Sequence, residues 1–166
     1  MGLDIVAFEH ARLVASCNRA RVKHQGHVVT WADIDMERSL RGLEGNRCYA
    51  VAGERLGFRA GSYIHFMEWR QALSRRALGV SAQTVWDDRS WVAEPFYELL
   101  NFSDCEGTIG PEAAADLAVD FAALRAKISA QPAKDAEFET WFMDSYDKFQ
   151  RAFELAAGGN GLVLFC

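Results

Sequence analysis

One eleven-residue segment that starts at Asn101, Asn-Phe-Ser-Asp-Cys-Glu-Gly-Thr-Ile-Gly-Pro, concentrates the side chains that could do chemistry. The carboxylates of Asp104 and Glu106 flank the thiol of Cys105, and Ser103 comes just before them. Polar side chains on a loop between rigid elements are typical of binding and catalytic sites. Asn, Ser and Asp are also the ordinary residues of turns, where they bond nearby backbone groups. The segment therefore predicts either a ligand-binding loop or a turn that satisfies its own polar groups.

Two specific kinds of chemistry could use this loop. Asp104, Glu106 and backbone carbonyls are oxygen ligands of the kind that a divalent hard cation prefers, although no complete calcium-loop spacing is present. Cys105 could serve as the nucleophile of a hydrolase-type enzyme, although its two acidic neighbours disfavour the thiolate. His24 and His27 lack a third ligand for a zinc-type site. The sequence indicates no metal and no cofactor.

A second segment, Phe-Arg-Ala-Gly-Ser-Tyr at residues 58–63, ends a predicted strand and begins a predicted helix. The fork of Arg59 could bind a carboxylate, either on a ligand or on Asp104, while Ser62 is placed to cap the helix. If they meet, residues 58–63 and 101–107 would form one polar pocket. The residues expected to line this pocket are Arg59, Ser62, Tyr63, Asn101, Ser103, Asp104, Cys105 and Glu106.

Alternation and turn residues predict where the strands lie. Strands are expected at residues 3–8, 27–31, 48–51, 55–59 and 162–165, with a turn at 52–54 that makes a hairpin of the third and fourth. Residues 32–46 are expected to form a loop or frayed helical turn, and residues 79–93 to be irregular.

Helical spacing predicts three long helices and one short one. The long helices are expected at residues 63–78, from Pro111 to near Gln131, and at 136–157. Residues 95–102 fit either a short helix or a buried strand, and the helix is favoured. Asp116 and Asp120 are expected on a solvated helix face. The order of elements predicts a single α+β domain over residues 1–166, a small antiparallel or mixed sheet with three main helices packed on one face. The last strand is expected near the first.

Composition bounds the class of protein. The chain has 166 residues and a net charge of −5. Residues 1–80 carry 12 Lys and Arg against 8 Asp and Glu, a net +4, whereas residues 81–166 carry 6 against 15, a net −9. Such a molecule could orient on a partner or associate with itself head to tail. Acidic overall charge without a basic, aromatic stripe argues against a nucleic-acid partner.

The cysteines and the lengths of the apolar runs indicate the cellular compartment of the protein. Four scattered cysteines and no visible export signal predict reduced thiols and a cytoplasmic protein. No apolar run approaches the ~20 residues that span a bilayer, so no membrane partner is expected.

Several motifs resemble a family of small uncharacterised bacterial and phage proteins. They are Phe58–Tyr63, Trp69-Arg70, Pro95-Phe96, the segment 101–111, Leu117 and Asp120-Phe121, with similar ends at residues 1–5 and 151–159. The chain departs where relatives carry Gly-Tyr-Asn, because Ile64-His65-Phe66 stands here. The family has no assigned activity, so the resemblance implies only a bacterial or prophage setting.

These observations favour a non-enzymatic binding or accessory protein that engages a protein partner or a small ligand through the polar pocket. The alternative is a hydrolase-type enzyme that uses Cys105, or a divalent-cation site at Asp104 and Glu106.

Overall fold

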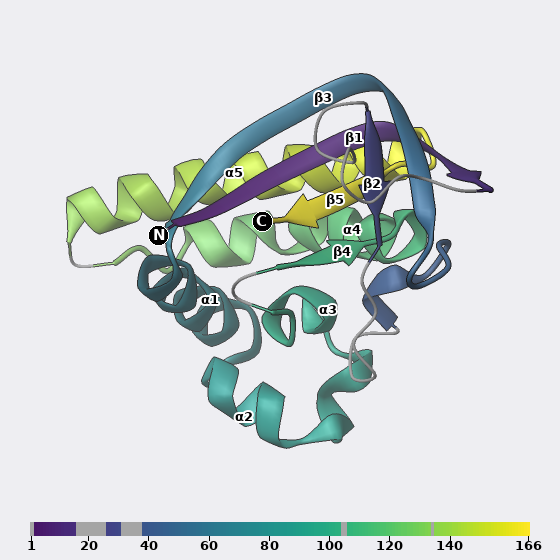
Figure 1. Cartoon of the computed structure of the whole chain (residues 1–166). Helices are drawn as coiled ribbons and strands as arrows, with labels where there is room; N and C mark the ends of the chain where they lie inside the picture. Colours follow the sequence, from purple (N-terminus) through teal and green to yellow (C-terminus); the bar gives the residue numbers. More distant parts are fainter. Residues whose placement is uncertain (1, 16–25, 31–37, 104–105, 134) are drawn as a thin grey trace.

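Two long antiparallel strands, β1 (Gly2–Val14) and β3 (Cys48–Ser62), dominate one five-stranded sheet (Figure 1). The computed structural model describes residues 2–15, 26–30, 38–103, 106–133 and 135–166. The shorter strands are β2 (His27–Val29), β4 (Gly107–Ile109) and β5 (Leu162–Phe165). All pairings are antiparallel, in the order β2-β3-β1-β5-β4. The α+β class and the pairing of the last strand with the first are confirmed.

The predicted hairpin within residues 48–59 is wrong, because β3 continues through it as one strand. Gly53 does adopt a left-handed φ of 80°. However, the register against β1 shifts there, between Phe8 and His10, so the glycine belongs to a bulge that bends the strand. This left-handed φ, which glycine adopts without steric cost, explains why the bend contains glycine.

The main helices begin and end close to where the sequence predicts them. They are α1 (Tyr63–Leu78), α4 (Pro111–Ser129) and α5 (Ala136–Gly158). Ser62 caps α1 by accepting the His65 N–H, and Gly79 ends the helix with a φ of 79°.

The segment after α1 is more regular than predicted. It contains α2 (Ala82–Asp87), the 3-10 helix η3 (Arg89–Ala93) and α3 (Tyr97–Leu100). Ser81 caps the start of α2 by accepting the Thr84 N–H. The prediction that residues 79–93 are irregular did not take this cap into account. The short helix expected within residues 95–102 is confirmed as α3.

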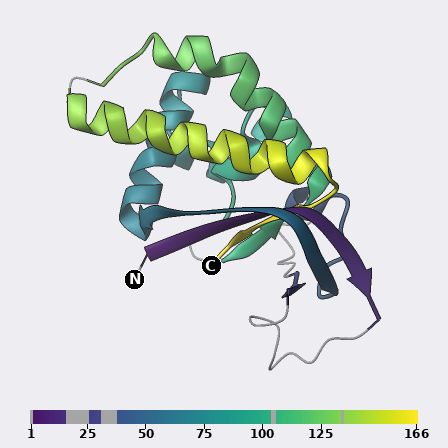
Figure 2. The same ribbon diagram turned by 90° about the horizontal axis from the view of Figure 1, so that it is seen from above.

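The aromatic core combines buried side chains of α1, α4 and α5 with those of the sheet. Helix α5 crosses β1, β3 and β5, and α4 packs against α5 (Figure 2). Trp69 and Phe149 stack with ring centroids 4.7 Å apart, and both are almost completely buried. The finer expectation that three main helices pack on one face stays a prediction.

Candidate functional site

Arg59 lies on the exposed surface of β3, where its side chain is 60% accessible. Its Nη1 is 3.6 Å from Oδ1 of Asp4 on the neighbouring strand β1. A Cβ on Gly2 would lie 2.0 Å from Nη2 of Arg59, so the glycine leaves room for the guanidinium. The predicted partner, Asp104, lies outside the described residues, together with Cys105. Among the described residues, Arg59 pairs only with this exposed carboxylate, and most of its side chain is accessible.

The other end of the predicted pocket lies three strands away, at the same end of the sheet. Strands β1 and β5 separate β3 from β4. On one side, Asp4 pairs with Arg59 of β3. On the other side, the Asp4 N–H donates to the Cys166 carbonyl at 2.8 Å, and the Cys166 N–H donates to the Asp4 carbonyl at 2.9 Å. Phe165 pairs with Gly107, so Glu106 occupies the position next to Cys166. We call Arg59, Asp4, Cys166 and Glu106 the polar row; all four are exposed.

The remaining residues of the first segment have structural contacts. Ser62 is occupied as the cap of α1, and Tyr63 is half-buried against the core. Both stand beside the polar row, because Ser62 pairs with Gly2 at the start of β1.

Side chains of the 101–107 segment bond within the segment and to α3. Nδ2 of Asn101 donates to the Tyr97 hydroxyl at 3.3 Å, and Oγ of Ser103 accepts the Glu106 N–H at 3.3 Å. These bonds are those expected of a turn. The segment then continues directly into the buried strand β4, where no strand was predicted. Use of Asp104 or Cys105 as ligand or nucleophile stays a prediction.

A different arginine reaches this segment from the helix. Arg70 on α1 is 3% accessible, and its Nη1 donates to the carbonyl oxygens of Leu100 and Phe102, at 3.3 and 2.5 Å. Its guanidinium lies 4.6 Å from the ring centroid of Phe66 and 5.2 Å from that of Trp86. The Trp86 indole also donates to the Leu100 carbonyl. Arg70 thus joins α1, α2 and the chain leading into the loop.

A carboxylate network lies beneath the start of α4. Oε1 of Glu98, a residue almost completely buried, is 3.2 Å from an Nη2 atom of both Arg38 and Arg41. Arg41 also binds Asp116 at 2.6 Å. The carbonyl of Arg41 accepts the Glu112 N–H near the first turn of α4. These contacts hold residues 38–41 against α3 and α4, which is a positioning role that Asp116 shares.

The solvated helix face predicted for Asp116 and Asp120 is confirmed for Asp116, whose side chain is 60% accessible, but Asp120 is half-buried. Its Oδ2 accepts the N–H of Phe96 at 2.7 Å. Phe96 is fully buried and has a left-handed φ of 63°, which is rare for a bulky residue. Burial raises the pKa of the Asp120 carboxyl above its ordinary value; the Phe96 N–H opposes this shift, and the charges of Glu98 and Asp116 add to it. The carboxylate therefore fixes a strained backbone at an electrostatic cost.

The sequence contained signals for some of these contacts. Arg70 falls on the helical stripe of Phe66 and Leu73, at spacings of four and three, so its periodicity indicates burial. Glu98 pairs with Arg41 and Arg38, which come 57 and 60 residues earlier in the chain. The sequence around Glu98 carries no signal for this pairing, because the pairing depends on tertiary structure.

The expectation of reduced thiols is wrong for Cys48, which is disulfide-bonded, whereas Cys166 carries an exposed thiol. Disulfides persist mainly in oxidising compartments, so the cytoplasmic location stays a prediction. Among the described residues, no three His, Cys, Asp or Glu side chains gather as a metal-binding group. In that part of the chain, no helix is both long and apolar enough to cross a bilayer.

Comparison with known proteins adds no relative: no family model, no curated protein and no solved structure matches this chain. The resemblance to bacterial and phage proteins therefore stays a prediction.

Proposed function

We propose that the protein is a non-enzymatic binding or accessory protein, of bacterial or prophage origin, that engages a protein partner through the polar row and the adjoining residues 58–63 and 101–107. The observation that carries the proposal is the register of four strand ends. It brings Arg59, Asp4, Cys166 and Glu106 side by side, although they come from distant parts of the sequence.

The shape of this surface favours a protein over a small ligand. Adjacent strands lie about 4.8 Å apart, so the row extends over roughly 14 Å from Arg59 to Glu106. Small-molecule sites are concave and enclose most of their ligand. An exposed row that carries an arginine at one end and a glutamate at the other suits a partner with the opposite order of charges.

The charges in the row are available because their internal contacts are weak. The Arg59–Asp4 pair is 3.6 Å long and more than half exposed on both sides. Exposed pairs of this kind contribute about 0–1 kcal/mol to stability, so a partner's carboxylate can compete for the guanidinium. Arg59 is thus a residue whose replacement would disturb binding more than folding.

The test is site-specific photocrosslinking in bacterial cells. A photoreactive residue at position 59 or 106 is expected to capture the same partner, and one at Arg151, an exposed position on α5, is not. Arg59→Ala and Glu106→Gln should each reduce capture of that partner from the other position. Equal capture from position 151, or different proteins from positions 59 and 106, contradicts the proposal.

The enzyme alternative is tested with separate measurements. Fast labelling of Cys105 by a thiol-reactive probe at neutral pH, with loss of an activity in Cys105→Ala, would replace the proposal with the hydrolase. A rise in melting temperature with divalent cations, abolished in Glu106→Gln, would replace the proposed binding function with a cation site.

A further inference from the structure

A shallow depression of about 500 Å³ lies on the first half of α5. It is lined by Ala136, Glu137, Thr140, Trp141 and Asp144. Glu137, Trp141 and Asp144 are spaced by four and three residues, so they share one face of the helix. The half-buried indole is braced by two rings, with centroids 5.3 Å away for Phe138 and 6.0 Å away for His65. An accessible indole between two carboxylates is thereby held in place.

This arrangement suits an arginine side chain. A guanidinium stacks over an aromatic face and at the same time donates to a carboxylate, while its methylene stem covers apolar surface. Asp144 is already 2.5 Å from the ammonium group of Lys148. In the part of the chain that the structure describes, Glu137 forms no ion pair, so it is the carboxylate with capacity to bind a cation.

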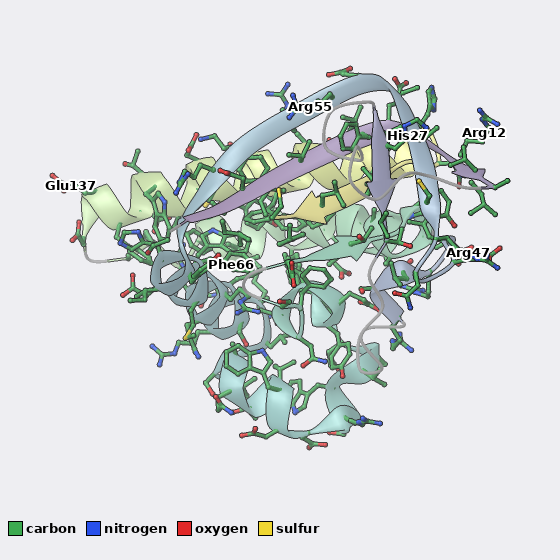
Figure 3. All side chains as sticks on the ribbon, viewed as in Figure 1. Arg12, His27, Arg47, Arg55, Phe66 and Glu137 are labelled. Carbon is green, nitrogen blue, oxygen red and sulfur yellow. The ribbon has the colours of Figure 1, made fainter. Side chains whose placement is uncertain are left out.

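The two long strands carry exposed arginines that could fill this role in a second copy. Arg12 on β1 and Arg55 on β3 are exposed, and neither has an ion pair among the described residues. The ring of Phe8 lies beneath Arg55 at 6.0 Å, which is a weak contact. Figure 3 shows Arg12 and Glu137 at opposite ends of the molecule, with Arg55 on the outer side of the β1–β3 ribbon. Neither arginine can reach the depression of its own chain.

We propose that the Trp141 depression binds an arginine from the β1–β3 ribbon of a second copy of this chain. The positive charges of Arg12 and Arg55 complement the Glu137 carboxylate, which has no ion pair among the described residues, and this complementarity favours a head-to-tail orientation. The two surfaces differ, so the contact leaves one of each unused and association is open-ended. Five residues line the depression, whereas a stable interface takes roughly 20–30 residues a side, so the association is weak, concentration-dependent and weakened by salt.

Sedimentation velocity of the full chain over a wide concentration range tests this inference. At low ionic strength the sedimentation coefficient should rise with concentration, and 0.5 M salt should remove the rise. Glu137→Arg should abolish it, as should the double variant Arg12→Glu and Arg55→Glu. The charge-swapped triple variant, which combines all three substitutions, should restore it.

Arg151→Glu is the matched control, because it reverses an exposed charge elsewhere on α5 and should leave association unchanged. Far-ultraviolet circular dichroism confirms that each variant is folded. A sedimentation coefficient independent of concentration in the wild type overturns the inference. So does association that survives Glu137→Arg, or a charge-swapped variant that stays monomeric. The outcome is separate from that of the proposed function, since no residue of the polar row is changed.

Discussion

Two arginines eleven residues apart show how differently this fold uses the same side chain. Arg59 lies on the outer surface of β3, more than half accessible, and contacts one exposed carboxylate at 3.6 Å. Arg70 is 3% accessible, donates to two backbone carbonyls and stacks on two aromatic rings. A buried hydrogen bond stabilises a fold because its loss leaves a buried donor or acceptor unsatisfied. An exposed ion pair contributes little to stability, so a group on a binding partner can replace one of its members. Arg70 therefore supports the chain at Leu100 and Phe102, whereas Arg59 is the residue to which the proposed function gives a binding role.

The largest effect is expected for Arg70→Met, which keeps an apolar stem but removes the guanidinium. The carbonyls of Leu100 and Phe102 would lose their charged donor in a buried site. Urea denaturation should show a loss of about 3 kcal/mol in the free energy of unfolding. Arg75→Met, on the exposed side of the same helix, should cost less than about 0.5 kcal/mol. Equal stability of these two variants would contradict the role of Arg70.

A smaller effect is expected at Asp120, where two substitutions separate hydrogen bonding from charge. Asp120→Ala removes the acceptor of the Phe96 N–H, whereas Asp120→Asn retains an oxygen that can accept it. The alanine variant should be about 1 kcal/mol less stable than the asparagine variant at neutral pH. If the two variants unfold at the same denaturant concentration, the bond to Phe96 contributes nothing.

The effect of pH on the stability contributed by Asp120 is expected to be smaller still, and its sign is definite. Because the pKa of Asp120 is raised in the folded protein, the folded state binds this proton more tightly than the unfolded chain does. Wild-type stability, measured relative to Asp120→Asn, should therefore increase as the pH falls from 7 through the raised pKa towards the unfolded value. A relative loss of wild-type stability over that range would show that the folded state prefers the ionised carboxylate.

The smallest effect on stability is expected for Arg59→Ala. Loss of an exposed pair should change the free energy of unfolding by less than about 0.5 kcal/mol. Capture of the partner from position 106 should nevertheless fall. A variant that is clearly destabilised would place Arg59 with Arg70 as part of the scaffold and remove the basis of the comparison.

The sequence predicted elements well where the signals are local. Ser62 and Gly79 bound α1 as their types suggest, and Pro111 begins α4. Gly53 was misread because glycine serves bulges as well as turns, and only the partner strand decides between them. The short β4 depends on pairing with β5, about 55 residues later, which no local pattern encodes.

The contacts of the predicted site depend on tertiary structure for the same reason. The two segments were expected as walls of one pocket, whereas sheet topology places β1 and β5 between their strands. The arginine that contacts residues 101–107 is Arg70, which lies on α1, eleven residues after Arg59. Register and burial, which decide these contacts, are properties of the folded chain as a whole.

Hydrogen–deuterium exchange of the amides at residues 101–110 tests the central claim most directly, when Arg59→Ala and Arg70→Met are compared with the wild type. If Arg70 holds this segment and Arg59 does not, exchange there should accelerate in Arg70→Met and stay at the wild-type rate in Arg59→Ala. Acceleration in Arg59→Ala equal to that in Arg70→Met would contradict the account.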